Sequence, residues 1–204
     1  MAKILIVDNG GQYVHRIWRS LREIGTQSEI VKPAHVHEKL SSVIGPQSPE
    51  NRRPKTQDRI IGLILSGGPT SVYEDDLGLS KELLNLTIPI LGICWGHQFI
   101  AHAMGGKVKY GKMGEYGHSI VEVDDEDQIL KGMLKRFQAW VSHRDEVVEL
   151  PPDFIHLAHS ETCKIEAMRH KSKSIFGVQF HPEVFHTQDG KTILKNFVEV
   201  CNNK

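Results

Sequence analysis

Apolar residues form short unbroken runs in the first half of the chain. Residues 3–8 (KILIVD), 60–65 (IIGLIL) and 88–94 (IPILGIC) are almost wholly apolar. Such runs are typical of strands that are buried on both faces of a parallel sheet. We therefore predict a strand in each of these ranges, and a further short strand over 29–31.

Between these strands the apolar positions change to helical spacing. Val14, Ile17, Trp18 and Leu21 fall at i, i+3, i+4 and i+7, and Gly25 suits the end of a helix. The predicted helices cover residues 12–25, 34–44 and 98–104. Strands that alternate with helices predict an α/β fold with an open, mostly parallel sheet flanked by helices.

The second half of the chain holds strand candidates with few helices between them. These candidates cover residues 118–123, 138–141, 154–158, 165–168 and 174–180, and a closing helix is predicted over 187–201. We expect antiparallel strands here, attached to the parallel sheet within a single domain of residues 1–204. Residues 45–58 (GPQSPENRRPKTQD) have no apolar side chain except three prolines, which predicts a flexible surface loop.

Composition excludes several classes of protein. Lys plus Arg equals Asp plus Glu at 25 each, so the net charge is zero. This balance argues against a nucleic-acid binder and against electrostatic docking to membranes. Three widely separated cysteines, Cys94, Cys163 and Cys201, argue against a disulfide framework. Together with a start that does not resemble a signal peptide, they indicate a cytoplasmic protein.

The segment Gly92-Ile93-Cys94-Trp95-Gly96 combines a predicted strand, a cysteine and a following helix. Glycines two residues before and two after the cysteine match the sharp strand–turn–helix elbow that presents a nucleophile. Side chains at the flanking positions of such a turn are expected to collide, and glycine leaves room. The amides at the start of the helix favour the reactive thiolate. A lone cysteine would indicate an inert core residue, whereas this context predicts a nucleophile.

Two further segments lie where they can complete such a site. Ser66-Gly67-Gly68-Pro69 follows the strand at 60–65, and its backbone amides can stabilise an oxyanion, with Gly68 and Trp95 as the expected donors. A plain turn explains these four residues equally well. At the end of another strand, His181 can act as a base for Cys94, and Glu183 can orient its imidazole.

In chain order, LSGGP, GICWGHQ and GVQFHPE resemble the motifs of the class-I, triad-type glutamine amidotransferases, over essentially the whole chain. The resemblance implies a flavodoxin-like fold, glutamine as the substrate, and Cys94, His181 and Glu183 as the catalytic triad. It also implies that Gln98 and the backbone around Ser142 and His143 bind glutamine. Trp95 is larger than the residue often found after the nucleophile, but only its amide is needed.

Segments 7–17 (VDNGGQYVHRI), 140–145 (WVSHRD) and 181–187 (HPEVFHT) are similar to the glutaminase units of GMP synthases. The sequence contains no SGGVDS-like loop for ATP. The resemblance therefore implies that this chain holds no cofactor, and that a GMP synthase ATP-pyrophosphatase subunit binds ATP, magnesium and XMP in a heterodimer. The alternatives are an amidotransferase subunit for another acceptor, such as chorismate in anthranilate or aminodeoxychorismate synthesis, and an inactive module on the same fold.

Histidines outside these motifs raise the question of a metal site. His35 and His37 form one pair, and His156 and His159 another. No cysteine or carboxylate lies near either pair at ligand spacing, so we expect surface histidines and no metal. The acidic segment 122–127 (EVDDED) is expected to be solvated rather than to bind a cation.

Overall fold

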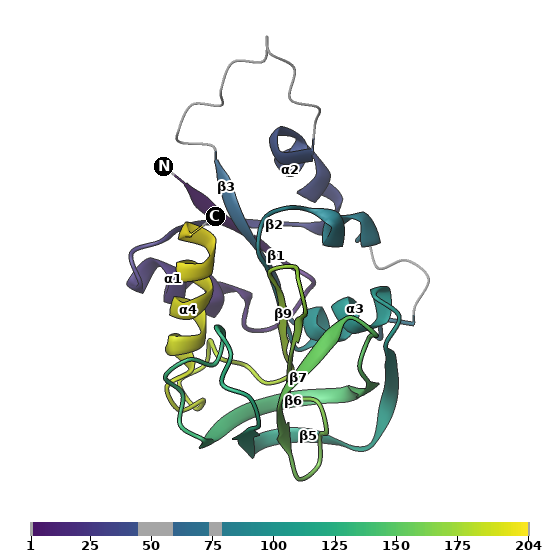
Figure 1. Ribbon diagram of the computed structural model, residues 1–204. Coiled ribbons are helices and arrows are strands. Elements are labelled where there is room, and N and C mark those ends of the chain that lie inside the picture. The colour runs from purple at the N-terminus through teal and green to yellow at the C-terminus, as the bar shows by residue number, and fades with distance from the viewer. Residues whose placement is uncertain (1, 45–58, 74–78, 204) are drawn as a thin grey trace.

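The computed structural model describes residues 2–44, 59–73 and 79–203 (Figure 1). In these ranges the strands form one sheet of nine, in the order β2-β1-β3-β4-β9-β8-β7-β5-β6. The strands are β1 (Lys3–Val7), β2 (Gln27–Val31), β3 (Ile60–Leu65), β4 (Ile90–Ile93), β5 (Lys107–Val123), β6 (Arg136–Glu149), β7 (Phe154–Ser160), β8 (Ala167–His170) and β9 (Ile175–Val178). The helices are α1 (Val14–Glu23), α2 (Val36–Ile44), α3 (Trp95–Ala103) and α4 (Gly190–Asn202), with 3₁₀ turns at Pro33–His35 and Lys81–Asn85. The loop predicted at 45–58 lies outside the described residues.

Strands β2, β1, β3, β4 and β9 pair in parallel and form the first half of the sheet. The order reverses between β1 and β3, because the chain runs outward from β1 to β2 and returns on the other side of β1. Ligands of open α/β sheets bind beyond the carboxyl ends of the strands at such a reversal. The loops that follow β1 and β3 meet there, and a Cβ added to Gly11 would lie 2.3 Å from the carbonyl oxygen of Gly67.

Strands β8, β7, β5 and β6 are antiparallel, which confirms the antiparallel addition expected in the second half. Two details differ from the prediction. The sequence predicts an antiparallel strand over 174–180, but β9 lies parallel to β4 and antiparallel only to β8. β5 and β6 extend far beyond the predicted 118–123 and 138–141, because they pair with each other from Lys107↔Glu149 to Glu122↔Arg136. Cross-strand pairing sets the length of such strands, and the local pattern does not show it.

Helices cover the two faces of the parallel half, and β1 illustrates why its sequence is continuously apolar. Ile4 and Ile6 pack into the core beneath α1 and α4, whereas Leu5 and Val7 pack into the core beneath α2 and α3. Figure 1 shows α1 and α4 side by side on one side of the sheet and α3 on the other. Among the described residues, no helix has the length and hydropathy that a bilayer crossing requires.

The elbow between β4 and α3 depends on glycine at two positions. α3 begins at Trp95, three residues before the predicted start at 98, so the helix follows the cysteine directly. A Cβ on Gly92 would lie 2.4 Å from the carbonyl oxygen of Gly96, and a Cβ on Gly96 would lie 2.2 Å from the carbonyl oxygen of Leu65 on β3. The atoms that exclude side chains are therefore backbone atoms, one of them on the neighbouring strand, rather than the flanking side chains we expected.

Replacing Gly96 by alanine should destabilise the fold by about 3 kcal/mol, near the upper end for overpacked cores. The added methyl group would meet a strand carbonyl that cannot move away without disrupting β3. Gly25→Ala is the matched control, since that glycine has a φ of +84° but nothing within 4 Å of an added Cβ. It should cost only the left-handed backbone penalty, about 1 kcal/mol. Urea unfolding of both variants measures the difference, and equal costs would refute the steric explanation.

Candidate active site

Cys94 occupies a strained backbone position at the carboxyl edge of the sheet. Its φ is 52° and its ψ is −106°, a region that residues with a Cβ rarely adopt. The amide of Cys94 donates to the carbonyl of Val178 on β9 (2.8 Å), and the amide of Gln98 donates to the carbonyl of Cys94 (3.1 Å). A neighbouring strand and the first turn of α3 therefore hold the strained residue in place.

His181 and Glu183 lie beside Cys94, just past the end of β9. Nδ1 of His181 is 2.8 Å from Oε1 of Glu183, and both side chains are buried. The amide of His181 donates to the carbonyl of Trp140 on β6 (2.9 Å), and the hydroxyl of Thr187 donates to the carbonyl of His181 (2.6 Å). The imidazole is thus fixed by its backbone and by its carboxylate partner.

The surroundings of His181 favour its protonated form. Burial lowers the pKa of the ring, but the adjacent Glu183 carboxylate and the hydrogen bond with Cys94 outweigh burial, and the pKa is raised well above its usual value. Tyr13 packs edge-on against the imidazole, with ring centroids 4.9 Å apart. Tyr13 in turn accepts a hydrogen bond from Nε1 of Trp140 (3.2 Å). An imidazolium next to a thiol stabilises the thiolate.

The glycine-rich loop after β3 packs against both reacting side chains. A Cβ on Gly67 would lie 3.3 Å from Cε1 of His181 and 3.7 Å from Cβ of Cys94. A Cβ on Gly68 would lie 3.3 Å from Cγ of Trp95. Trp95 is the first residue of α3, and the amides of the first helical turn have no partner within the helix. The two residues expected to donate to an oxyanion therefore lie close together, next to the nucleophile.

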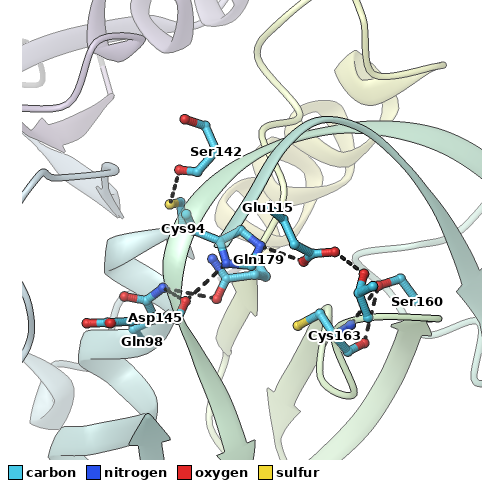
Figure 2. Close-up of polar contacts among 10 residues, drawn as sticks. Cys94, Gln98, Glu115, Ser142, Asp145, Ser160, Cys163 and Gln179 are labelled. Atoms are coloured by element: carbon cyan, nitrogen blue, oxygen red, sulfur yellow. Dashed lines mark hydrogen bonds and ion pairs between the residues drawn. The ribbon is translucent and has the colours of Figure 1, made fainter. Parts of the chain in front are cut away.

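A chain of buried polar contacts supports the other side of the pocket (Figure 2). Nε2 of Gln98 donates to the carbonyl of Asp145 (2.6 Å) and to Oε1 of Gln179 (3.2 Å). The ring of His143 lies between the same carbonyl (Nδ1, 3.1 Å) and Glu115 (Nε2 to Oε2, 3.0 Å). These contacts join α3 to the β5–β6 hairpin and occupy the side chain of His143, so only the backbone of that residue is available to a ligand.

The pocket enclosed by these elements has a volume of about 460 Å³, large enough for a small metabolite. Cys94, Gln98, Ser142, His143, His181 and Glu183, all named from the sequence, line it together with Gly68. The thiol of Cys94 donates to the carbonyl of Ser142 (3.7 Å). Trp95 is not among the lining residues, but its side chain lies next to Gly68, which is.

Sequence reasoning missed several residues of this site. Three residues have no predicted role but contact residues that do: Glu115 contacts His143, Gln179 contacts Gln98, and Tyr13 contacts His181. The sequence also does not predict the close packing of Gly67 against His181 and Cys94. No local signal marks Glu115, because its partner His143 is far away in the sequence and is brought near by the pairing of β5 with β6. Gln179 lies within the GVQFHPE segment, but its partner Gln98 is on α3, and the local sequence does not show this contact.

Comparisons with known proteins agree with this geometry. The family model described as glutamine amidotransferase class-I matches residues 5–201. The chain is 47% identical to a protein of Pyrococcus abyssi that is named as a subunit of glutamine-hydrolyzing GMP synthase, over 97% of this chain and 98% of that protein. It is 48% identical to the protein of the same name from Methanocaldococcus jannaschii, with 98% of each covered.

Solved structures show the same fold. A Thermoplasma acidophilum protein, provisionally described as a GMP synthase subunit, superimposes with a TM-score of 0.85 at 38% identity and covers 100% of this chain and 95% of that one. A glutamine amidotransferase from Thermotoga maritima, at 22% identity and a TM-score of 0.66, shares the fold over 99% of this chain and 83% of its own. The chain belongs to the class-I glutamine amidotransferase family.

Proposed function

We propose that this chain is the glutaminase subunit of a two-subunit GMP synthase. Cys94, His181 and Glu183 meet at one pocket, and this arrangement carries the glutaminase part of the proposal. The names of relatives that are 43–48% identical over nearly their full length support GMP synthase rather than a chorismate amidotransferase. Those names describe one subunit of the synthase, which supports a separate partner. ATP, magnesium and XMP belong to that partner, an ATP-pyrophosphatase subunit.

The first step of the proposed reaction is attack by Cys94. The thiolate, paired with the His181 imidazolium, adds to the side-chain amide carbon of glutamine and forms a tetrahedral oxyanion. The amides of Gly68 and Trp95 donate to this oxygen, and each such donor accelerates comparable reactions by roughly 10²–10³-fold. Gln98 and the backbone of Ser142 and His143 hold the substrate in the pocket.

The second half of the reaction releases glutamate. His181 gives its proton to the departing nitrogen, the C–N bond breaks, and ammonia leaves a thioester on Cys94. His181, now neutral, takes a proton from water as the water attacks the thioester, and glutamate leaves as the thiolate is restored. Glu183 stabilises each imidazolium form and fixes the ring's orientation. Ammonia passes to the partner, which aminates activated XMP. The three free thiols fit the cytoplasm, where we place the complex.

Cys94→Ala should abolish glutamine-dependent GMP formation by the complex and leave ammonia-dependent formation intact. The variant loses only the thioester step, while the partner's chemistry needs no more than free ammonia. GMP formation from XMP is measured with each nitrogen source in turn. Retained use of glutamine would disprove the nucleophile. If the chain supported amination of chorismate with a chorismate-binding partner, and not amination of XMP, the proposed acceptor would be wrong.

Glu183→Gln should lower kcat by about 10²–10⁴-fold with a small change in KM, as loss of the orienting carboxylate does in other triads. Because Glu183 raises the pKa of His181, its removal lowers that pKa, and the imidazolium loses its proton at lower pH. The alkaline limb of kcat/KM should therefore move to lower pH. Glu199→Gln, on an exposed position of α4, is the control and should change neither value. An unshifted pH profile in Glu183→Gln would contradict the assignment.

The isolated glutaminase should be slow, and the nucleotide-loaded partner should activate it. Uncoupled hydrolysis would waste glutamine, and without a partner one side of the pocket is open to solvent. Glutamate release is measured for the isolated chain, for the chain with its partner, and for both with ATP and XMP. Equal rates in all three mixtures would rule out activation.

A further inference from the structure

Two histidines and an aspartate converge on the antiparallel half of the sheet, outside the pocket that contains Cys94. Nε2 of His156 lies 2.7 Å from Oδ2 of Asp124, and Nδ1 of His159 lies 2.6 Å from the same oxygen. The three atoms are all within 4.8 Å of one another. The sequence favours surface histidines over a metal site here, because no carboxylate lies nearby at ligand spacing, but the fold brings Asp124 to them from 32 and 35 residues away.

A β-bulge places the two histidines on one face of β7. In a regular strand, side chains three residues apart point to opposite faces. The pairing of β7 with β8 shifts register between His156 and Ala158, and Leu157 and Ala158 are both buried in succession. The extra residue turns His156 and His159 to the same side, with ring centroids 6.3 Å apart. Bulges of this kind commonly re-aim side chains near functional sites.

Backbone hydrogen bonds fix Asp124 opposite the bulge. The amides of Asp124 and Asp125 both donate to the carbonyl of Leu157, at 2.8 Å and 3.1 Å. One step earlier, Val123 at the end of β5 pairs with Ala158. All three side chains therefore extend from main chain that is anchored within the sheet, and their convergence does not depend on a flexible loop.

We propose that His156, His159 and Asp124 form a binding site for a first-row divalent metal ion, with Zn²⁺ as the ion it favours. Two imidazole nitrogens and one carboxylate oxygen suit Zn²⁺, Co²⁺ or Ni²⁺, whereas Ca²⁺ and Mg²⁺ prefer oxygen ligands alone. The three side chains are 33%, 41% and 39% exposed, which allows an ion to enter and water to complete its coordination.

Binding of the ion requires the three side chains to adjust their positions. Zn–N and Zn–O bonds of about 2.0–2.1 Å place tetrahedral ligand atoms about 3.3 Å apart. The carboxylate oxygen must therefore withdraw by roughly 0.6 Å. The two imidazole nitrogens, which lie within 4.8 Å of each other, must reach the same spacing, and partly exposed side chains can make both movements by rotation.

A second group of ligand types, Glu115, Cys163 and Glu166, is less suited to a cation. Burial raises the pKa of Glu166 to about 8, and it also raises the pKa of the Cys163 thiol far above its usual value. Both groups therefore keep their protons at neutral pH, and a metal would have to displace them. Glu115 is already engaged by His143. These differences favour the partly exposed histidine pair.

The test is a titration of the full chain with Zn²⁺ and with Co²⁺, after treatment with a chelator. Cys94→Ala serves as the parent, because the nucleophilic thiol can bind either ion itself. Calorimetry should give one Zn²⁺ per chain, Co²⁺ should produce the visible absorption of a nitrogen- and oxygen-ligated ion, and Zn²⁺ should raise the unfolding temperature.

Adding His156→Gln or Asp124→Asn to the parent should weaken Zn²⁺ binding by roughly 10- to 100-fold or more. Loss of a residue that only hydrogen-bonds to a metal ligand already costs this much, and these two residues are proposed as ligands themselves. The controls are His37→Gln, an exposed histidine outside the cluster, and Cys163→Ser, and both should bind as the parent does. Failure of the parent to bind one equivalent would overturn the site. Unchanged binding in His156→Gln and Asp124→Asn, or binding lost in Cys163→Ser instead, would overturn it as well.

Discussion

The close approach of α3 to the ends of β3 and β4 is the constraint on which the active site depends. It holds Cys94 at a positive φ, which costs of order 1–3 kcal/mol. The same approach buries Trp95, Phe99 and Ile100, and each side chain of this size contributes about 1.5–3 kcal/mol when fully buried. Packing of the helix therefore outweighs the strain at the nucleophile, and the glycine at position 96 makes the packing possible.

The mixed sheet brings the reacting groups together. Cys94 follows β4, and β4 is paired in parallel with β9, so the chain beyond β9 delivers His181 and Glu183 to the same edge. The antiparallel half adds the carbonyl of Ser142, which contacts the thiol, and the buried contacts of His143. A buried polar group without a partner costs about 1–3 kcal/mol, so these contacts also fix how the β5–β6 hairpin lies against α3.

The sequence alone determined the parts of this protein that depend on neighbouring residues. Continuous apolar runs located β1, β3 and β4 to within two residues, because burial on both faces leaves no other pattern. The glycines around Cys94 identified the elbow, since only glycine tolerates the backbone contacts at positions 92 and 96. The order of the motifs then indicated His181 as the base and Glu183 as the orienting carboxylate. Both residues line the same pocket as Cys94, which agrees with these roles.

Pairing between distant strands fixes the remaining features, and these appear only once the chain is folded. The local pattern could not give the full length of β5 and β6 or the parallel pairing of β9 with β4, because register is set by the partner strand. For the same reason Glu115 was not recognised as the partner of His143. The position of Asp124 beside His156 and His159 depends on the pairing of β5 with β7 and on the one-residue bulge in β7. The local sequence predicts neither feature.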